Sequence, residues 1–125
     1  MPYPNTGSVV LGYDRNFFTK VTVTATSFGQ FTSTSPSPYV PGPAPDVVIT
    51  FNTQGLQLLN LTTPGTSGSV VEYSFNGQTV HGELNPTNGS IGLTFDNRPV
   101  SKIWFRVQTG SAGPIQVSVQ AWSIP

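Results

Sequence analysis

Few residues of this 125-residue chain could carry out acid–base or nucleophilic chemistry. His81 is the single histidine, and the Asn76-Gly77 pair predicts a tight hairpin that sets His81 opposite Glu72. A histidine–carboxylate pair can serve as a general base, but it needs a nucleophile beside it. The chain has no Cys, and no Ser stands in a nucleophile motif. We therefore interpret the pair as a half-exposed cross-strand contact and expect the protein not to be an enzyme.

Metal and cofactor sites have little more support. One His, no Cys and five scattered acidic residues cannot make a zinc site. Asp96 and Asn97, together with backbone carbonyls, could bind calcium. However, Asp and Asn open ordinary turns far more often than they bind metals. We expect no metal and no cofactor.

A basic and aromatic segment surrounds Trp104, which stands between Lys102 and Arg106, with Arg98 nearby. Such a stripe can stack on single-stranded nucleic acid. Five basic residues balance five acidic ones, however, so the chain lacks the field that attracts nucleic acid or anionic membranes. Two interpretations stay open. Trp104 and Arg106 either anchor a protein interface or form a surface cap in which lysine and arginine stems cover the indole.

Glycans offer a further possibility. Trp104, Trp122 and Tyr39 could line a sugar-binding platform. The triplets Asn60-Leu61-Thr62 and Asn88-Gly89-Ser90 match the N-glycosylation acceptor pattern. Such triplets also arise by chance in a chain rich in Ser and Thr.

The elements that position these residues are expected to be β-strands, because apolar residues recur with a period of two. Strands are expected at 8–13, 17–28, 46–52, 56–62, 70–75, 78–84, 91–95, 102–108 and 114–122. The leucines of 56–62 break the alternation, which suggests a bulge or a strand covered on both faces. The sequence therefore predicts an all-β fold, a two-sheet antiparallel β-sandwich of about eight strands, jelly-roll or immunoglobulin-like.

The last two strands carry the clearest inward face. A hairpin across 109–113 would set one apolar stripe opposite another, and its members are Ile103, Phe105 and Val107 facing Val119, Val117 and Ile115. The opposite side of the same hairpin is then outward and polar. It carries Lys102, Trp104, Arg106, Gln116, Ser118, Gln120 and Trp122.

Two segments do not fit the sheets of this single domain, residues 1–125. They are an N-terminal arm at 1–7 and a Pro- and Ser-rich loop at 29–45. Both carry apolar side chains that need a partner to cover them. We expect these segments to contact neighbouring subunits, together with the outward face. The expected interface residues are Tyr3, Phe31, Tyr39, Val40, Trp104, Arg106 and Trp122.

The composition indicates where such a chain works. Charged residues make up 8% of the chain, against about 25% in ordinary soluble domains, which suits a protein packed against neighbours. The first residues have neither the basic nor the apolar region of a signal peptide. No apolar run is long enough to span a membrane. A virion component that is made in the host cytoplasm would combine these properties, as would a mature fragment whose signal peptide has been removed.

The C-terminal half resembles small β-sandwich proteins of tailed bacteriophages, in the segment 71–77, the strand 101–106 and the closing Ala121-Trp122. This resemblance implies a virion protein of the capsid decoration or cement type. Its partners would be the major capsid protein or other virion subunits, and it would be a homo-oligomer in the assembly. A tail or receptor-binding module and a carbohydrate-binding module are the alternatives.

Overall fold

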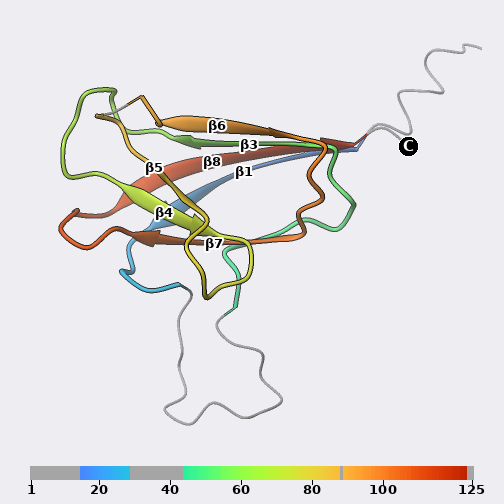
Figure 1. The fold of residues 1–125 in the computed structure, drawn as a ribbon, viewed down its shortest axis with the longest axis horizontal. Coiled ribbons are helices and arrows are strands. Elements are labelled where there is room, and N and C mark those ends of the chain that lie inside the picture. The colour runs from blue at the N-terminus through green and yellow to red at the C-terminus, as the bar shows by residue number, and fades with distance from the viewer. Residues whose placement is uncertain (1–14, 29–43, 88, 124–125) are drawn as a thin grey trace, which may run out of the picture.

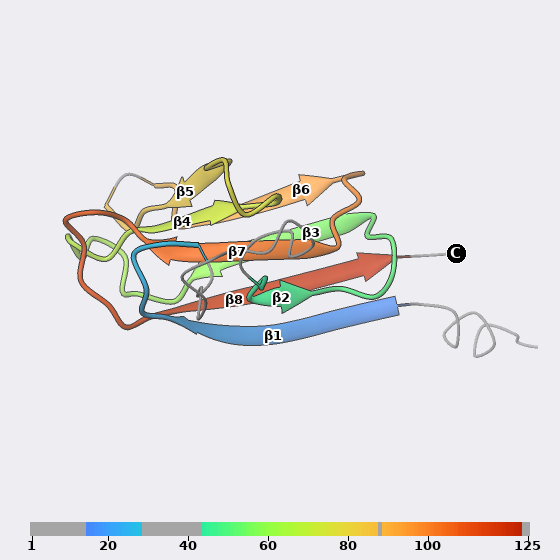
Figure 2. The ribbon, with the colours of Figure 1, turned by 90° about the horizontal axis from the view of Figure 1, so that it is seen from below.

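The computed structural model describes residues 15–28, 44–87 and 89–123. Its strands form two antiparallel sheets of four that pack face to face (Figures 1 and 2). The first sheet has the order β1-β8-β3-β6 and the second the order β2-β7-β4-β5. The strands are β1 (Arg15–Val23), β2 (Val47–Val48), β3 (Gly55–Asn60), β4 (Val71–Ser74), β5 (Gly82–Leu84), β6 (Gly92–Asp96), β7 (Lys102–Val107) and β8 (Ile115–Ser123). The predicted all-β sandwich of about eight strands is confirmed.

The core lies between the two sheets and follows the period-two pattern of the sequence. On β8 the side chains of Ile115, Val117, Val119 and Ala121 are buried, and the residues between them are not. The side chains of two further segments also face the core at a spacing of two or four residues: Phe17, Val21, Val23, Val47, Ile49 and Phe51. Every second residue of these strands points to the same face, so a regular alternation is enough to define the buried side. The described residues include no helix that is long and apolar enough to cross a membrane.

The predicted hairpin between the last two strands is wrong. β7 and β8 lie in different sheets, and residues 108–114 cross from one sheet to the other. β8 pairs instead with β1 and β3, while β7 pairs with β2 and β4. The two apolar stripes still face the core, because stripes that meet across a sandwich have the same pattern as stripes on neighbouring strands. The inward residues are therefore confirmed and only their pairing changes.

The predicted two-residue hairpin at Asn76-Gly77 is also wrong. β4 and β5 pair with Tyr73 opposite Gly82, and Glu72 faces Glu83 rather than His81. The connection is a wide loop that local side chains hold. The Ser74 hydroxyl accepts hydrogen bonds from the backbone N–H groups of residues 76 and 77 at 3.2 and 2.9 Å. The Asn76 side chain accepts two more, from residues 78 and 79, at 2.9 and 2.8 Å. Side-chain bonds of this kind compete with a tight turn.

β3 has no bulge. It pairs without interruption with β8 on one side and β6 on the other, and Leu56 and Leu58 face the core. Leu59 and Leu61 break the alternation because they lie on the outer side of the sheet, where Leu61 is 39% exposed. Several predictions fall outside the described residues: the strand at 8–13, the arm at 1–7, most of the loop at 29–45, and the contacts assigned to Tyr3, Phe31, Tyr39 and Val40.

Candidate interface on the outer face of the first sheet

The sandwich separates the predicted aromatic anchors. Trp104 and Arg106 belong to β7 in the second sheet, whereas Trp122 belongs to β8 in the first sheet. Their side chains alternate with core residues, so they lie on the two opposite outer faces of the sandwich. The three residues cannot form one surface. A sugar platform that contains both tryptophans is excluded for the same reason.

Trp104 lies on an outer face but is covered there. Its exposed fraction is 8%, because the loop at 75–81 lies over the indole ring. A Cβ atom on Gly77 would stand 2.8 Å from Cε2 of Trp104, so only glycine lets the loop approach this closely. Gly77 also has a φ of 78°, which favours glycine independently. Trp104 is on the outward side of its strand, as predicted, but it is buried beneath the loop and supports it.

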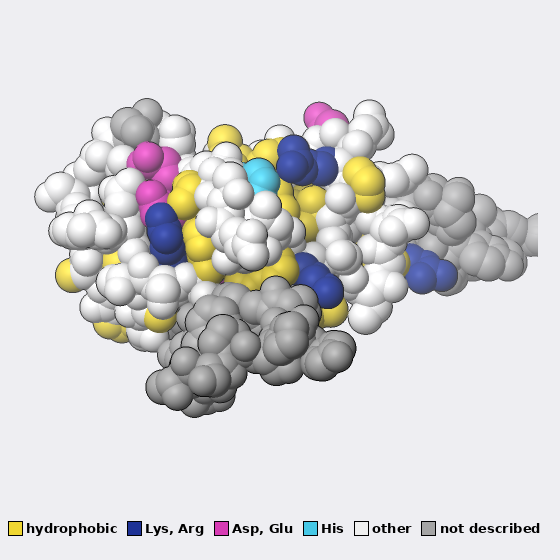
Figure 3. Space-filling model, turned by 60° about the horizontal axis from the view of Figure 1, so that its bottom comes forward, with side chains coloured by type: hydrophobic (Ala, Val, Ile, Leu, Met, Phe, Trp, Pro, Cys, Tyr) yellow, Lys and Arg dark blue, Asp and Glu magenta, His cyan; other side chains and the backbone are white. Residues whose placement is uncertain are grey.

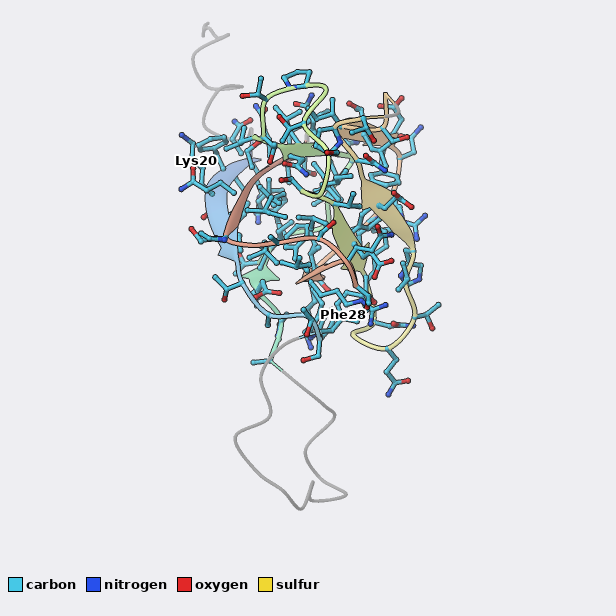
Figure 4. The ribbon with its side chains drawn as sticks, turned by 90° about the vertical axis from the view of Figure 1, so that its left-hand side faces the viewer. Lys20 and Phe28 are labelled. Atoms are coloured by element: carbon cyan, nitrogen blue, oxygen red, sulfur yellow. The ribbon has the colours of Figure 1, made fainter. Side chains whose placement is uncertain are left out.

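Arg106 is engaged within the chain. Its Nε atom donates to Oε1 of Glu72 at 2.6 Å, and its guanidinium lies 4.5 Å from the centre of the Phe28 ring. The arginine therefore joins the segment after β1 to the outer side of the second sheet. Figure 4 shows Phe28 well away from Lys20, which is a residue of β1.

An aromatic cluster occupies the side of the sandwich near β5 and β6. Rings of Tyr73 and Phe75 lie 5.5 Å apart, and both are within 6.0 Å of the Phe95 ring. Arg98 covers the cluster, 4.6 Å from the Phe75 ring centre. Burial raises the pKa of the Tyr73 hydroxyl, and the nearby charge of Arg98 offsets part of that rise. Arg98 therefore packs on two aromatic rings of its own chain.

His81 belongs to the border of this cluster. Its Nδ1 atom accepts a hydrogen bond from the backbone N–H of Phe75 at 3.0 Å, and the two rings are 5.1 Å apart. The imidazole is exposed, and its bond goes to the loop backbone. The cross-strand pair with Glu72 is therefore wrong.

Replacing His81 by Ala is expected to leave function intact and to lower the free energy of unfolding by no more than about 1 kcal/mol. The reason is that water can replace its single hydrogen bond at an exposed site. Urea denaturation measures the change, and His81→Gln, which keeps a polar acceptor, is the control. A folded His81→Ala protein without function would contradict this prediction.

Two clefts open between β1 and residues 44–52. The larger, about 490 Å³, has Arg15 as its only titratable lining residue among those described. The smaller, about 300 Å³, has Asp46 among its lining residues. Burial raises the pKa of the Asp46 carboxyl, and the hydrogen bond from the Phe105 N–H at 2.8 Å offsets part of the rise. This bond ties the segment before β2 to β7, so a structural role accounts for Asp46.

Neither cleft pairs two groups for acid–base work. Within the described ranges, no three His, Cys, Asp or Glu side chains gather where they could hold a metal ion. The Asp96-Asn97 turn contains Asn97 at a φ of 56°, and its N–H bonds to the Gln54 carbonyl. That geometry suits a turn residue.

The outer face of the first sheet has a different character. The register sets Phe18 opposite Gln120, and Gln120 opposite Gln57 on its other side. Phe18 is 62% exposed. We name this surface the glutamine face, and its outward residues are Asn16, Phe18, Lys20, Thr22, Gln57, Leu59, Thr94, Gln116, Ser118, Gln120 and Trp122. Lys20 on β1 is its one basic residue, and Asp96 on β6 lies at the opposite border.

Trp122 lies flat on this face. A Cβ atom on Gly55 would stand 2.0 Å from Cε2 of the indole, so the ring lies directly over the glycine backbone. Apart from Lys20 and Asp96, the charged side chains of the described residues lie elsewhere. Figure 3 shows acidic and basic groups together on the side of the second sheet, where Glu72, Glu83, Lys102 and Arg106 belong. The glutamine face is thus a mainly uncharged surface with one exposed aromatic side chain, Phe18, and the half-buried Trp122.

No protein-family model and no curated protein matches this chain. The surfaces just described therefore carry the functional inference. The sequence placed Trp122 and the glutamines of β8 outward but did not single out Phe18 or Gln57. The signal was available, because the alternation that turns Phe17 inward turns Phe18 outward.

Proposed function

We propose that this protein is a non-enzymatic structural component that docks on partner proteins through the glutamine face. The assembly we propose is the virion of a tailed bacteriophage, in which the chain acts as a capsid decoration protein that binds neighbouring capsid subunits. The single observation that carries the proposal is the mainly uncharged glutamine face with Phe18 62% exposed. The resemblance of the C-terminal half to phage β-sandwich proteins supports the choice of assembly.

The physical reasoning starts from what an interface core needs. Interface cores are depleted in charge and enriched in aromatic residues. Burying an exposed Phe contributes about 1.5–3 kcal/mol, so covering Phe18 favours association. Gln57 and Gln120 each bring two donors and one acceptor, which a partner surface can satisfy. Little charge has to be desolvated when this face is covered.

The second candidate is glycan binding on the same face. Its support is the flat indole of Trp122 beside Gln120 and Gln57, since aromatic faces stack on sugar rings and amides bond to hydroxyls. A tail or receptor-binding module could use the same surface. The test must therefore distinguish a protein partner from a glycan.

Phe18→Glu is expected to weaken binding to capsids that lack the protein by about tenfold or more, because the partner would have to desolvate a carboxylate. Co-sedimentation of purified chain with such capsids measures the dissociation constant. Val48→Glu is the matched control, because Val48 is 52% exposed and lies in the second sheet. This control is expected to bind as the wild type does.

The alternatives give different results in the same series. Normal capsid binding by Phe18→Glu contradicts docking through the glutamine face. Binding of the wild type to a glycan array, lost in Trp122→Ala, supports the glycan function instead. Thermal melting of each variant confirms that the fold is retained.

A further inference from the structure

β1 presents a long sheet edge. It pairs with β8 along all nine of its residues, from Arg15 to Val23. Within the described part of the chain no strand pairs with its other edge. Figure 2 shows β1 along one border of the molecule. The other edge strands, β2, β5 and β6, have two, three and five residues.

The sequence of β1 does little to protect that edge. Proteins block exposed edges with prolines, bulges, short strands or several charges. β1 contains no Pro, and its register with β8 runs without a bulge. Arg15 is at its first residue, and Lys20 is the only charge in its interior. An edge with these properties is suited to pairing with another strand.

Hydrogen bonds of β8 show which backbone groups of β1 face outward. The Leu61 N–H donates to the Gln116 carbonyl. The even-numbered residues of β8 therefore direct their backbone N–H and C=O groups toward β3, and the odd-numbered residues direct theirs toward β1. Because odd-numbered residues of β1 stand opposite odd-numbered residues of β8, the backbone groups of those β1 residues point toward β8. The even-numbered residues of β1 direct their N–H and C=O groups to the outer edge, and they are Asn16, Phe18, Lys20 and Thr22.

We propose that two copies of this chain pair antiparallel through β1, with the two-fold axis at Thr19. In this register Phe18 stands opposite Lys20 of the partner subunit, and the same contact recurs across the axis. Both side chains belong to the glutamine face and are exposed in the single chain. On the inner side Phe17 meets Val21 of the partner subunit, and the two Thr19 residues face each other.

Charge and overlap select this register. A Lys ammonium over an aromatic ring is attractive, and here it occurs twice. With the axis at Lys20, two lysines would stand directly opposite, which is unfavourable. With the axis at Phe18, Thr22 and Val23 would have no partner within β1 as the structure describes it. The axis at Thr19 pairs every residue from 15 to 23. All four residues whose backbone groups point to the outer edge then form hydrogen bonds with the partner strand.

This pairing goes beyond the proposed function, since it needs no capsid and no glycan. It joins the two first sheets into one continuous sheet of eight strands. The glutamine faces of both copies then lie on the same side of that sheet. A partner would meet a surface twice as wide.

Disulfide trapping tests the register directly, because the chain has no cysteine of its own. Thr19→Cys is expected to form an interchain disulfide under mild oxidation. Opposed residues on the axis have Cα atoms about 4.5–5.5 Å apart, which a disulfide can span. Phe18→Cys and Lys20→Cys are the matched controls and are expected to cross-link at least about tenfold more slowly. In each control the cysteine of one subunit would lie two residues along the strand from the same cysteine of the partner subunit. Equal or faster cross-linking by either control would overturn the register.

Charge variants provide an independent readout by sedimentation equilibrium. Phe18→Lys is expected to raise the dimer dissociation constant about tenfold or more, because two lysines then face each other, whereas Phe18→Glu should keep the dimer. Lys20→Pro removes a backbone N–H that points to the outer edge, and it should likewise dissociate the dimer without unfolding the edge strand.

A wild-type chain that stays monomeric at about 1 mM, or a Phe18→Lys protein that dimerises normally, would overturn the proposal. Because Phe18→Glu keeps the dimer and loses capsid binding, failure of this inference is distinguishable from failure of the proposed function.

Discussion

Replacing Phe105 by Ala is expected to lower the free energy of unfolding by about 3–5 kcal/mol. Phe105 is 2% exposed and is the largest of the fully buried side chains in the described part of the chain, on β7 between the two sheets. The substitution removes its apolar contacts and leaves a cavity that the surrounding β-strands can fill only in part, because sheets on both sides hold their backbones in place. Urea denaturation at constant m-value measures the loss.

Phe18→Ala is the matched control for this prediction, since it changes the same residue type at a 62% exposed position. Its expected effect is within about 0.5 kcal/mol when measured on the monomer. A Phe105→Ala protein with wild-type stability would mean that the side chain points away from the core. The register of β7 would then be displaced by one residue.

The inward faces could be predicted from the sequence because they depend only on alternation. Val47, Ile49 and Phe51 follow one another at a spacing of two, as do Ile103, Phe105 and Val107, and each set faces the core. Burial on one side of a strand requires this pattern regardless of which strand lies beside it. The all-β fold and its two layers follow from the same signal.

Strand pairing could not be predicted in the same way. The stripes of β7 and β8 would suit neighbours in one sheet or opposite strands in two sheets, and the sequence alone does not distinguish the two. The Asn76-Gly77 signal failed for a local reason. Ser74 and Asn76 offer side-chain oxygens to the loop backbone, and a wide loop uses them better than a two-residue turn.

The candidate site was predicted in part. Trp122 and the glutamines of β8 are outward, as the alternation indicates. A hairpin of β7 and β8 predicts Trp104 on the same surface as Trp122. Placing β7 and β8 in separate sheets moves Trp104 to the opposite face, and the glycine at position 77 then allows the loop to cover it. Such coverage depends on a tertiary contact that no local pattern encodes.

Asn60 shows how a motif can mislead when its surroundings are unknown. The sequence Asn60-Leu61-Thr62 matches a glycosylation acceptor, but Asn60 is 1% exposed at the end of β3. Its Nδ2 atom donates to the carbonyls of Ser69 and Leu84 at 2.8 and 3.0 Å. Its Oδ1 atom accepts from the Thr62 N–H at 3.0 Å. The amide therefore joins three separate backbone positions and is not accessible for modification in the folded chain.

Asn60→Ala is therefore expected to lower the free energy of unfolding by about 3 kcal/mol or more, because it leaves three backbone groups without their partner at about 1–3 kcal/mol each. Asn60→Asp should be less stable still at neutral pH, since a carboxylate keeps the acceptor but presents negative charge to two carbonyl oxygens. Asn52→Ala, at an exposed position, is the control and should change stability by no more than about 0.5 kcal/mol. Urea denaturation of the three proteins provides the comparison. Equal stability of Asn60→Ala and Asn52→Ala would mean that water replaces the amide, and the connection from β3 to the segment before β4 would then depend on packing alone.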